Sequence, residues 1–210
     1  VLSDHIVENL KKYNVSHNNK IISITMPYIF QKNSITVDMN HKLNNFGVIG
    51  YGNPKVMKNI VENINSLNLK NKYNFWNIGA NTSGLKDIDN IIFPVESGFL
   101  SRDDIEKYSK KLDFTIILYD KSSYAVSCSA TPMESILYSK PIIYLNNSCI
   151  NEFNKHNIGI KCESIEELIE CIVDIISNPK KYKKQYQVYM KNILDLRSKL
   201  NLDRRKNIVI

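Results

Sequence analysis

Short, continuously apolar segments alternate with helix-like segments along most of the chain, and this alternation constrains the fold more than any other feature. The helix-like segments repeat an apolar residue every three or four positions, as Val56, Ile60 and Ile64 do. Continuously apolar strands are typical of parallel sheets that are covered on both faces. We therefore predict an α/β fold with a doubly wound, Rossmann-like parallel sheet. The expected strands are residues 46–50, 73–79, 90–95, 114–119, 141–145 and 158–162.

Capping residues mark where several of the intervening helices should begin. Asn53 and Pro54 are a favourable N-cap and first-turn pair. Ser101 precedes a helix that should run through Lys111, and Ser164 forms a capping box with Glu167. These capping residues indicate helix starts between the expected strands, and they do so independently of the apolar pattern.

The two ends of the chain differ from this regular part. Residues 1–30 are interpreted as the last helix, capped by Ser3, and the last strand, ended by Pro27, of a preceding domain. Residues 31–45 are polar, have no helical apolar period and are the expected linker. The sheet domain should span residues 46–178, and residues 179–210 should form a basic C-terminal helix.

The formal net charge of +7 comes largely from that C-terminal segment. Its basic residues are either the solvated face of a terminal helix or a surface that attracts anionic lipid head groups or acidic substrates. They are not interleaved with an RNA- or DNA-binding signature, so nucleic acid is not an expected partner. The longest apolar stretches, such as residues 114–119, are too short to cross a bilayer.

The cysteines and histidines give no sign of a metal or disulfide site. No cysteine belongs to a C-x-x-C pair, and we interpret all of them as reduced thiols of a cytosolic protein. Cys128 is either a reactive thiol near a helix start or a small buried residue. Asp87 and Asp89 form a D-x-D motif, but they precede a strand and are interpreted as a turn. We expect no bound metal. The cysteines are at positions 128, 149, 162 and 171, and the histidines at 5, 17, 41 and 156.

The loop before the helix at Thr131 is the best candidate for a ligand site. Ligands of parallel sheets bind at the carboxyl ends of the strands, where this loop should lie. Ser129 and Ala130 are small, so backbone N–H groups can approach a ligand, and a helix start suits a diphosphate. Glu134 follows Thr131 by three positions, so a T-x-x-E capping box explains it as well as ligand binding does.

Residues 46–178 resemble the C-terminal, donor-binding domain of GT-B glycosyltransferases of the family-4 (group 1) type. Three segments in order carry the resemblance. "FGVIGYGNPK" is a glycine loop followed by a lysine, and "GFLSRDDIEKYSKKLDFTIILY" is a glycine, a helix, an aspartate and a strand. "SCSATPMESILYSKPII" is a small-residue loop, a helix with an early glutamate, and a K-P turn into a strand.

The resemblance implies a role for each matching residue. Lys55 would contact the donor diphosphate, although a solvated first-turn lysine is also compatible with the sequence. The loop residues 129–131 would offer backbone N–H groups to the same phosphates. Glu134 would accept hydrogen bonds from the ribose hydroxyls, and residues 97–99 would border the base. The expected substrate-binding residues are therefore Gly50, Lys55, Gly98, Ser129, Ala130, Thr131 and Glu134.

By the same resemblance, the complete enzyme would be a hexosyltransferase-type glycosyltransferase that needs no cofactor. It would move a sugar from a nucleotide diphosphate sugar to a glycan or lipid-linked acceptor, in bacterial surface polysaccharide synthesis. The setting would be the cytoplasm or the inner face of the membrane. Residues 1–30 would end the acceptor domain, which normally carries the catalytic base, so this chain alone is expected to be inactive.

Two positions depart from the family pattern. Val126 stands where many members have a further glutamate near the transferred sugar, and Tyr51 stands where an arginine often follows the loop glycine. These departures favour an alternative, a non-catalytic nucleotide-binding or assembly module of the same fold.

Overall fold

A parallel sheet of six strands forms the centre of the molecule in the computed structural model. The structure describes residues 1–14, 21–24, 26, 28–30, 42–50, 52–79, 83–94 and 100–201. The strand order is β3-β2-β1-β4-β5-β6, and every pair of neighbours is parallel. Each strand overlaps a predicted one, so the predicted fold class is confirmed. The strands are β1 (Asn45–Ile49), β2 (Asn74–Ile78), β3 (Ile91–Ile92), β4 (Phe114–Ile117), β5 (Ile142–Leu145) and β6 (Gly159–Cys162).

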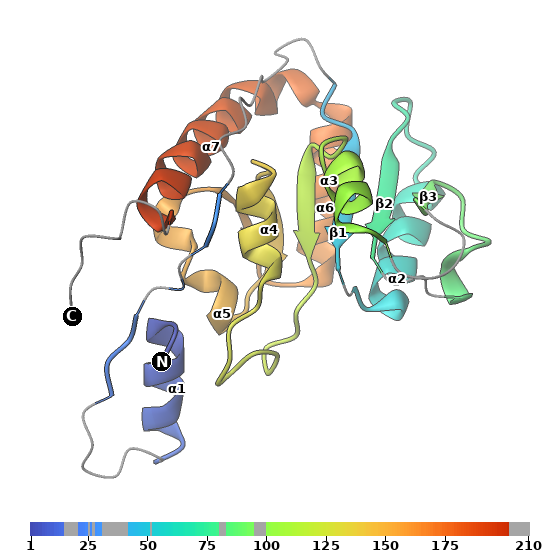
Figure 1. Ribbon diagram of the computed structural model, residues 1–210. Helices are drawn as coiled ribbons and strands as arrows, with labels where there is room; N and C mark the ends of the chain where they lie inside the picture. The colour runs from blue at the N-terminus through green and yellow to red at the C-terminus, as the bar shows by residue number, and fades with distance from the viewer. Residues whose placement is uncertain are drawn as a thin grey trace.

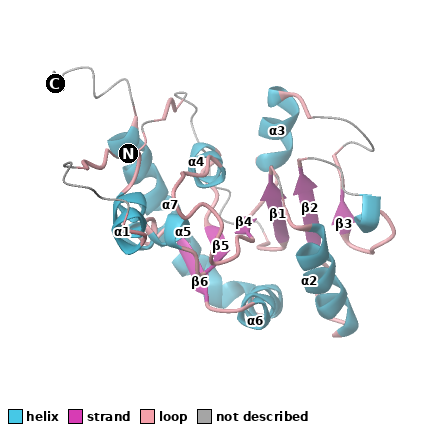
Figure 2. Cartoon of the chain, turned by 90° about the horizontal axis from the view of Figure 1, so that it is seen from below, coloured by secondary structure: helices cyan, strands magenta, loops and turns pink. Residues whose placement is uncertain are grey.

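Helices cover both faces of this sheet (Figure 2). The helices α2 and α6 lie on one face, and α3, α4 and the second half of α7 lie on the other. The α-helices are α1 (Asp4–Lys12), α2 (Pro54–Ser66), α3 (Arg102–Ser109), α4 (Thr131–Leu137), α5 (Ser148–Asn151), α6 (Ile165–Ser177) and α7 (Pro179–Leu200). The short 3₁₀ helices are η1 (Ser83–Leu85) and η2 (Asn154–His156).

Burial on both faces explains why the strands are continuously apolar. In β1, Phe46 and Val48 pack against the α2 and α6 side, whereas Ile49 packs on the opposite side. Phe46 also stacks on Phe114 of the neighbouring strand β4, with ring centroids 5.9 Å apart. Since neither face of these strands meets water, alternation with polar residues would leave polar groups buried without partners.

The predicted caps are formed at three helix starts. Asn53 accepts hydrogen bonds from the backbone N–H groups of the first turn of α2. Ser101 accepts a bond from the N–H of Asp104 at the start of α3. Ser164 accepts one from Glu167 at the start of α6. In each cap the donor and the acceptor are two or three positions apart, so the local sequence is enough to predict the bond.

The N-terminal segment agrees with the prediction only in part. Helix α1 is present, but Ser3 makes no side-chain capping bond, because its hydroxyl lies against Glu152 and His5. The expected strand before Pro27 is wrong for the described residues 21–24, 26 and 28–30, which form only an isolated bridge between Tyr28 and Asn201. A strand needs a sheet edge beside it, and here Ile24 bonds Val1 while Tyr28 bonds the end of α7 at Leu200. Most of the expected linker, residues 31–41, lies outside the described residues.

Helix α7 crosses the molecule from α6 to α4 (Figure 1). Ile193 and Leu196 of α7 are buried in one apolar cluster with Met133 and Ile136 of α4. Tyr186, nearer the start of α7, meets the ring of Phe114 edge-on at 5.3 Å. In the part of the chain that the structure describes, no helix combines the length and hydrophobicity that a membrane crossing requires.

Candidate functional site

The loops after β1, β2 and β4 meet at the carboxyl edge of the sheet. Gly50, directly after β1, has φ +85°, a left-handed conformation that favours glycine. The N–H of Gly50 donates to the carbonyl of Ile78 at 2.8 Å. A Cβ on Gly79 would overlap the carbonyl oxygen of Gly50. A Cβ on Gly50 would lie 3.8 Å from the hydroxyl of Thr131. The structure therefore brings Gly50 and Thr131 together, as expected for residues of one site.

Ser129 organises the loop that leads into α4. Its side chain is buried, and its hydroxyl lies 2.5 Å from that of Tyr119 and accepts a bond from the N–H of Thr131 at 3.2 Å. Burial raises the pKa of Tyr119 to about 12, so this phenol keeps its proton as a donor at neutral pH. Ala130 is exposed, and among the described residues its N–H has no partner. Of the expected phosphate contacts, the N–H of Ala130 is thus open, while that of Thr131 already has an acceptor.

The T-x-x-E capping box is not formed. Helix α4 begins with Ala130 as its N-cap residue, and the N–H of Glu134 donates to the carbonyl of Ala130 at 3.0 Å. The Ser129 hydroxyl, one residue earlier, accepts the N–H that starts the helix. The carboxylate of Glu134 is therefore not needed at the helix start, and the capping explanation for this residue is wrong.

Glu134 instead lies at the centre of a polar cluster beneath the edge of the sheet. Its Oε1 accepts hydrogen bonds from the Arg102 guanidinium at 2.9 Å and from the Tyr28 hydroxyl at 2.5 Å. Its side chain is only 14% exposed, and in the described part of the chain its buried Oε2 has no hydrogen-bond partner. The Arg102 guanidinium also lies 5.8 Å from the centre of the Tyr138 ring. One oxygen of this carboxylate is thus bonded within the described part of the chain, and the other is buried.

The charges in this cluster shift the pKa values of its members. The hydrogen bond to Glu134 raises the pKa of Arg102 above its ordinary value. Burial, and then the bond to Glu134, raise the pKa of Tyr28. Burial, and then the Glu134 charge, also raise the pKa of Tyr138. Arg102 therefore stays cationic and both phenols stay protonated, so Arg102 and Tyr28 remain donors to this carboxylate.

Sequence reasoning missed Arg102 and Tyr28. The contact of Tyr28 with Glu134 joins residues 106 positions apart, and that of Arg102 joins residues 32 positions apart. No local pattern marks such pairs. Only the long-range packing of the N-terminal segment against α7 places Tyr28 here, where its N–H donates to the carbonyl of Leu200 at 3.3 Å.

The remaining predicted residues are distributed as follows. Lys55 is exposed on the first turn of α2, and among the described residues its ammonium group forms no ion pair. Val126 is 54% exposed on the loop after β4. Gly98 and Tyr51 lie outside the described residues. Lys55, on the first turn of α2, and Gly50, directly after β1, thus lie at the same edge of the sheet.

Neither of the other chemical candidates has a site around it. Asp87 and Asp89 lie in a turn, as interpreted, and the described residues contain no cluster of side chains that could hold a metal ion. All cysteines are free thiols. Burial, and then the charge of Glu152, raise the pKa of Cys128, so this thiol is not an activated nucleophile.

Comparison with known proteins supports the fold. No family model and no curated protein sequence matches the chain. Among solved structures, the C-terminal domain of the glycosyl transferase group 1 family protein LpcC from Francisella tularensis gives a TM-score of 0.55 at 17% identity, with 75% of this chain and 86% of that domain covered. TarM, whose mutant was solved from S. aureus, gives 0.64 at 13% identity, with 93% of this chain covered. Sucrose-phosphate synthase from Thermosynechococcus elongatus gives 0.62 at 12% identity, with 97% of this chain covered.

This chain spans only part of the larger of these proteins, 39% of TarM and 54% of the sucrose-phosphate synthase. The match to the LpcC domain, by contrast, covers most of both chains. The TM-scores above 0.5 show that the matched regions of all three proteins share the fold of this chain. The chain therefore has the fold of the C-terminal, Rossmann-like domain of GT-B glycosyltransferases.

Proposed function

We propose that this chain is the donor-binding part of a glycosyltransferase that uses a nucleotide diphosphate sugar. Lys55 and the N–H of Ala130 contact the diphosphate, next to Gly50 and Thr131. Glu134 accepts a hydrogen bond from a ribose hydroxyl, and the segment around Gly98 borders the base. The acceptor is a glycan or a lipid-linked glycan of a bacterial surface polysaccharide, and the transfer takes place in the cytoplasm or at the inner face of the membrane.

The observation that carries the proposal is the state of the Glu134 carboxylate. A buried carboxylate oxygen without a hydrogen-bond partner costs about 1–3 kcal/mol or more. Helix capping does not require this residue, and Arg102 and Tyr28 occupy only Oε1. A ribose hydroxyl that reached Oε2, after a shift of the side chains that bury it, would remove this cost.

Two further observations support the proposal. The site lies at the carboxyl edge of a parallel sheet, which is where such folds bind ligands. One of the similar solved structures is a TarM mutant in complex with fondaparinux, α-GlcNAc-glycerol and UDP. UDP and a GlcNAc-bearing compound, bound to a protein of similar fold, belong to the ligand classes that we propose here.

Calorimetric titration of the whole chain with UDP, GDP, ADP and CMP tests nucleotide binding. We expect one nucleoside diphosphate to bind, and Glu134→Gln to weaken it about tenfold or more, because a charged acceptor is lost. Lys55→Ala should weaken diphosphate binding more than nucleoside binding. Glu106→Gln and Lys58→Ala are matched controls, since both residues lie in surface ion pairs on α3 and α2. Failure of all four nucleotides to bind the wild-type chain would contradict the proposal.

The alternative, a non-catalytic nucleotide-binding or assembly module, is favoured by one observation. Val126, where a further glutamate would stand near the transferred sugar, is an exposed apolar side chain. Both functions predict nucleotide binding, so binding alone does not separate them. Sugar transfer by a polypeptide that also carries an acceptor domain supports the enzyme, and nucleotide binding without transfer by that longer polypeptide supports the module.

A further inference from the structure

The Tyr28 hydroxyl, from the N-terminal segment, covers one oxygen of the Glu134 carboxylate. It donates to Oε1 at 2.5 Å, and the Arg102 guanidinium donates to the same oxygen at 2.9 Å. The Arg102 side chain is 55% exposed, whereas Oε2 of Glu134 is buried. Oε1 is therefore on the more open side of the carboxylate, and a ligand hydroxyl that approaches from solvent meets it first.

Arg102 and Tyr28 together use the hydrogen-bonding capacity of Oε1. An ionised carboxylate has about four lone-pair sites, two on each oxygen. Both sites of Oε1 are taken, so a further donor bonds there only after one of these two has left. Arg102 is a cation and is held by charge as well as by the hydrogen bond, whereas Tyr28 is a neutral donor. Tyr28 is thus the more weakly held of the two and is the one that a ligand displaces.

The chemistry of Tyr28 matches that of a ribose. A phenol and a sugar hydroxyl each present one O–H group, and a carboxylate accepts a hydrogen bond from either. Burial, and then the hydrogen bond to Glu134, raise the pKa of Tyr28, so its hydroxyl keeps the proton that it donates. The Tyr28 hydroxyl therefore fills, on Oε1, the place that a hydroxyl of the ligand would take.

The backbone at Tyr28 is held loosely, and its anchor lies two residues later. Tyr28 belongs to no helix or strand and lies beside α4 and the end of α7 (Figure 1). Its N–H donates to the carbonyl of Leu200 at 3.3 Å, which is longer than the usual range of about 2.7–3.2 Å. Phe30, in contrast, is buried, and its ring lies 5.4 Å from the Arg197 guanidinium. Tyr28 can therefore turn away from Glu134 while Phe30 keeps the segment in place.

We propose that Tyr28 is an autoinhibitory contact, which a ribose hydroxyl of the donor nucleotide displaces from Oε1 of Glu134. This regulation of the same site rests on the function proposed above. While Tyr28 is bonded, Oε1 does not accept the ligand, so only the fraction of molecules in which Tyr28 has turned away binds with full affinity. Removal of the Tyr28 hydroxyl should therefore strengthen nucleotide binding. A residue that only supported Glu134 would have the opposite effect, because its removal would weaken binding.

Calorimetry with the whole chain compares the wild type with Tyr28→Phe, which removes the hydroxyl and keeps the ring. The probes are UDP, GDP and ADP, each with its 2′,3′-dideoxy form. We expect Tyr28→Phe to bind the preferred diphosphate about tenfold more tightly, because a hydrogen bond to a charged group no longer competes. The dideoxy form, which has no hydroxyl for Glu134, should bind both proteins equally. Tyr13→Phe is the matched control and should change neither affinity, since Tyr13 is 63% exposed at the end of α1.

Chemical labelling of Glu134 tests the cover without any nucleotide. A water-soluble carbodiimide with glycinamide converts accessible carboxylates to amides, and peptide mass spectrometry gives the rate at Glu134. We expect severalfold faster labelling of Glu134 in Tyr28→Phe than in the wild type, and the wild-type rate in Tyr13→Phe. Glu106, which forms a surface ion pair with Lys110, should be labelled at the same rate in each protein.

Three outcomes would overturn the proposal. Weaker or unchanged diphosphate binding by Tyr28→Phe would mean that Tyr28 supports Glu134 or leaves it unaffected. An equal gain for the dideoxy form would mean that Tyr28 does not compete with a ribose hydroxyl. Equal labelling of Glu134 in the wild type and Tyr28→Phe would mean that Tyr28 does not cover the carboxylate. Absence of nucleotide binding by both proteins would instead contradict the function proposed above, and with it the displacement by ribose, whereas the labelling rate would still show whether Tyr28 covers Glu134.

Discussion

At the scale of single residues, Gly50 carries the contact between the loops after β1 and β2. Its left-handed backbone disfavours any side chain, at a cost of about 1–2 kcal/mol. We therefore expect Gly50→Ala to lower the free energy of unfolding by about that amount, measured by urea denaturation. Gly84→Ala is the control, because nothing lies within 4 Å of its added Cβ and its φ is not in the left-handed region. Equal losses in both variants would show that the Gly50 conformation is not strained for alanine.

The buried thiol of Cys149 gives a prediction about pH. Burial raises its pKa from the ordinary 9.0 to about 11, so the folded state keeps a proton that the unfolded chain releases. This contribution to stability is complete below pH 9 and is lost as the pH rises from 9 to 11, by about 2–3 kcal/mol. Cys149→Ala removes it. The difference in unfolding free energy between wild type and variant should therefore shrink over this range, and a constant difference would contradict the assigned cause.

At the scale of elements, α1 is attached mainly through polar side chains. Asn9 donates to the carbonyl of Ala125 at 2.7 Å, and Nε2 of His5 lies 3.1 Å from the carbonyls of Tyr124 and Ser127. These bonds hold the loop that leads to Ser129. Asn9→Ala should make the amides of residues 123–127 exchange about fivefold faster with deuterium, because one bond of about 1 kcal/mol is lost. Glu8→Ala, on the exposed face of α1, is the control and should leave this exchange unchanged.

The same elements show how far the sequence could predict the structure. The apolar run of β4 and the N-cap residue Asn53 are signals within a few neighbouring positions, and both elements were predicted. Ser3 was expected to cap α1 for the same local reason, but its hydroxyl bonds Glu152, 149 positions later. The T-x-x-E box failed because Ala130 is the N-cap residue of α4, and the Ser129 hydroxyl accepts the N–H of Thr131. Local patterns predict the elements well, and they fail where a residue outside the pattern binds the same group.

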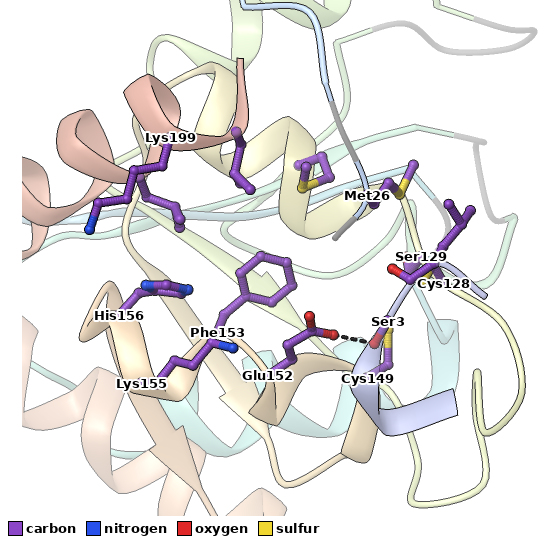
Figure 3. Close-up of a pocket in the computed structure, with 14 residues that line it drawn as sticks. Ser3, Met26, Cys128, Ser129, Cys149, Glu152, Phe153, Lys155, His156 and Lys199 are labelled. Carbon is purple, nitrogen blue, oxygen red and sulfur yellow. Dashed lines mark hydrogen bonds between the residues drawn. The ribbon is translucent and has the colours of Figure 1, made fainter. Parts of the chain in front are cut away.

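At the scale of the whole molecule, the fold was predictable and the candidate site only in part. The resemblance identified Gly50, Thr131 and Glu134 at one edge, and the geometry places Gly50 beside Thr131. Arg102 and Tyr28 reach Glu134 through packing that no motif encodes. A cavity lined by Ser3, Glu152 and Leu200 likewise joins both ends of the described chain, so it becomes visible only once α1 and α7 are placed (Figure 3).

The number of sheet domains in the described residues leads to a last prediction. We expect this 210-residue polypeptide to bind a donor nucleotide without transferring sugar. In the GT-B arrangement the reaction takes place in a cleft between two Rossmann-like domains, and the described residues contain a single six-stranded sheet. Before β1 they contain one helix and no strand, which is less than the roughly 30 residues of ordered β-α-β structure that even one unit of a second sheet requires. One wall of the cleft would then be missing.

The test of sugar transfer is the consumption of a sugar nucleotide in the presence of an acceptor extract. The sugar nucleotide should carry the base of the nucleotide that binds in the calorimetric titration. We expect no turnover by the 210-residue polypeptide and turnover by a longer polypeptide in which an acceptor domain precedes Val1. Glu134→Gln in the longer polypeptide should reduce turnover at low donor concentration, because it weakens donor binding about tenfold. Transfer by the short polypeptide at the rate of the long one would contradict the two-domain arrangement, since the edge formed by Gly50, Thr131 and Glu134 would then be sufficient for catalysis.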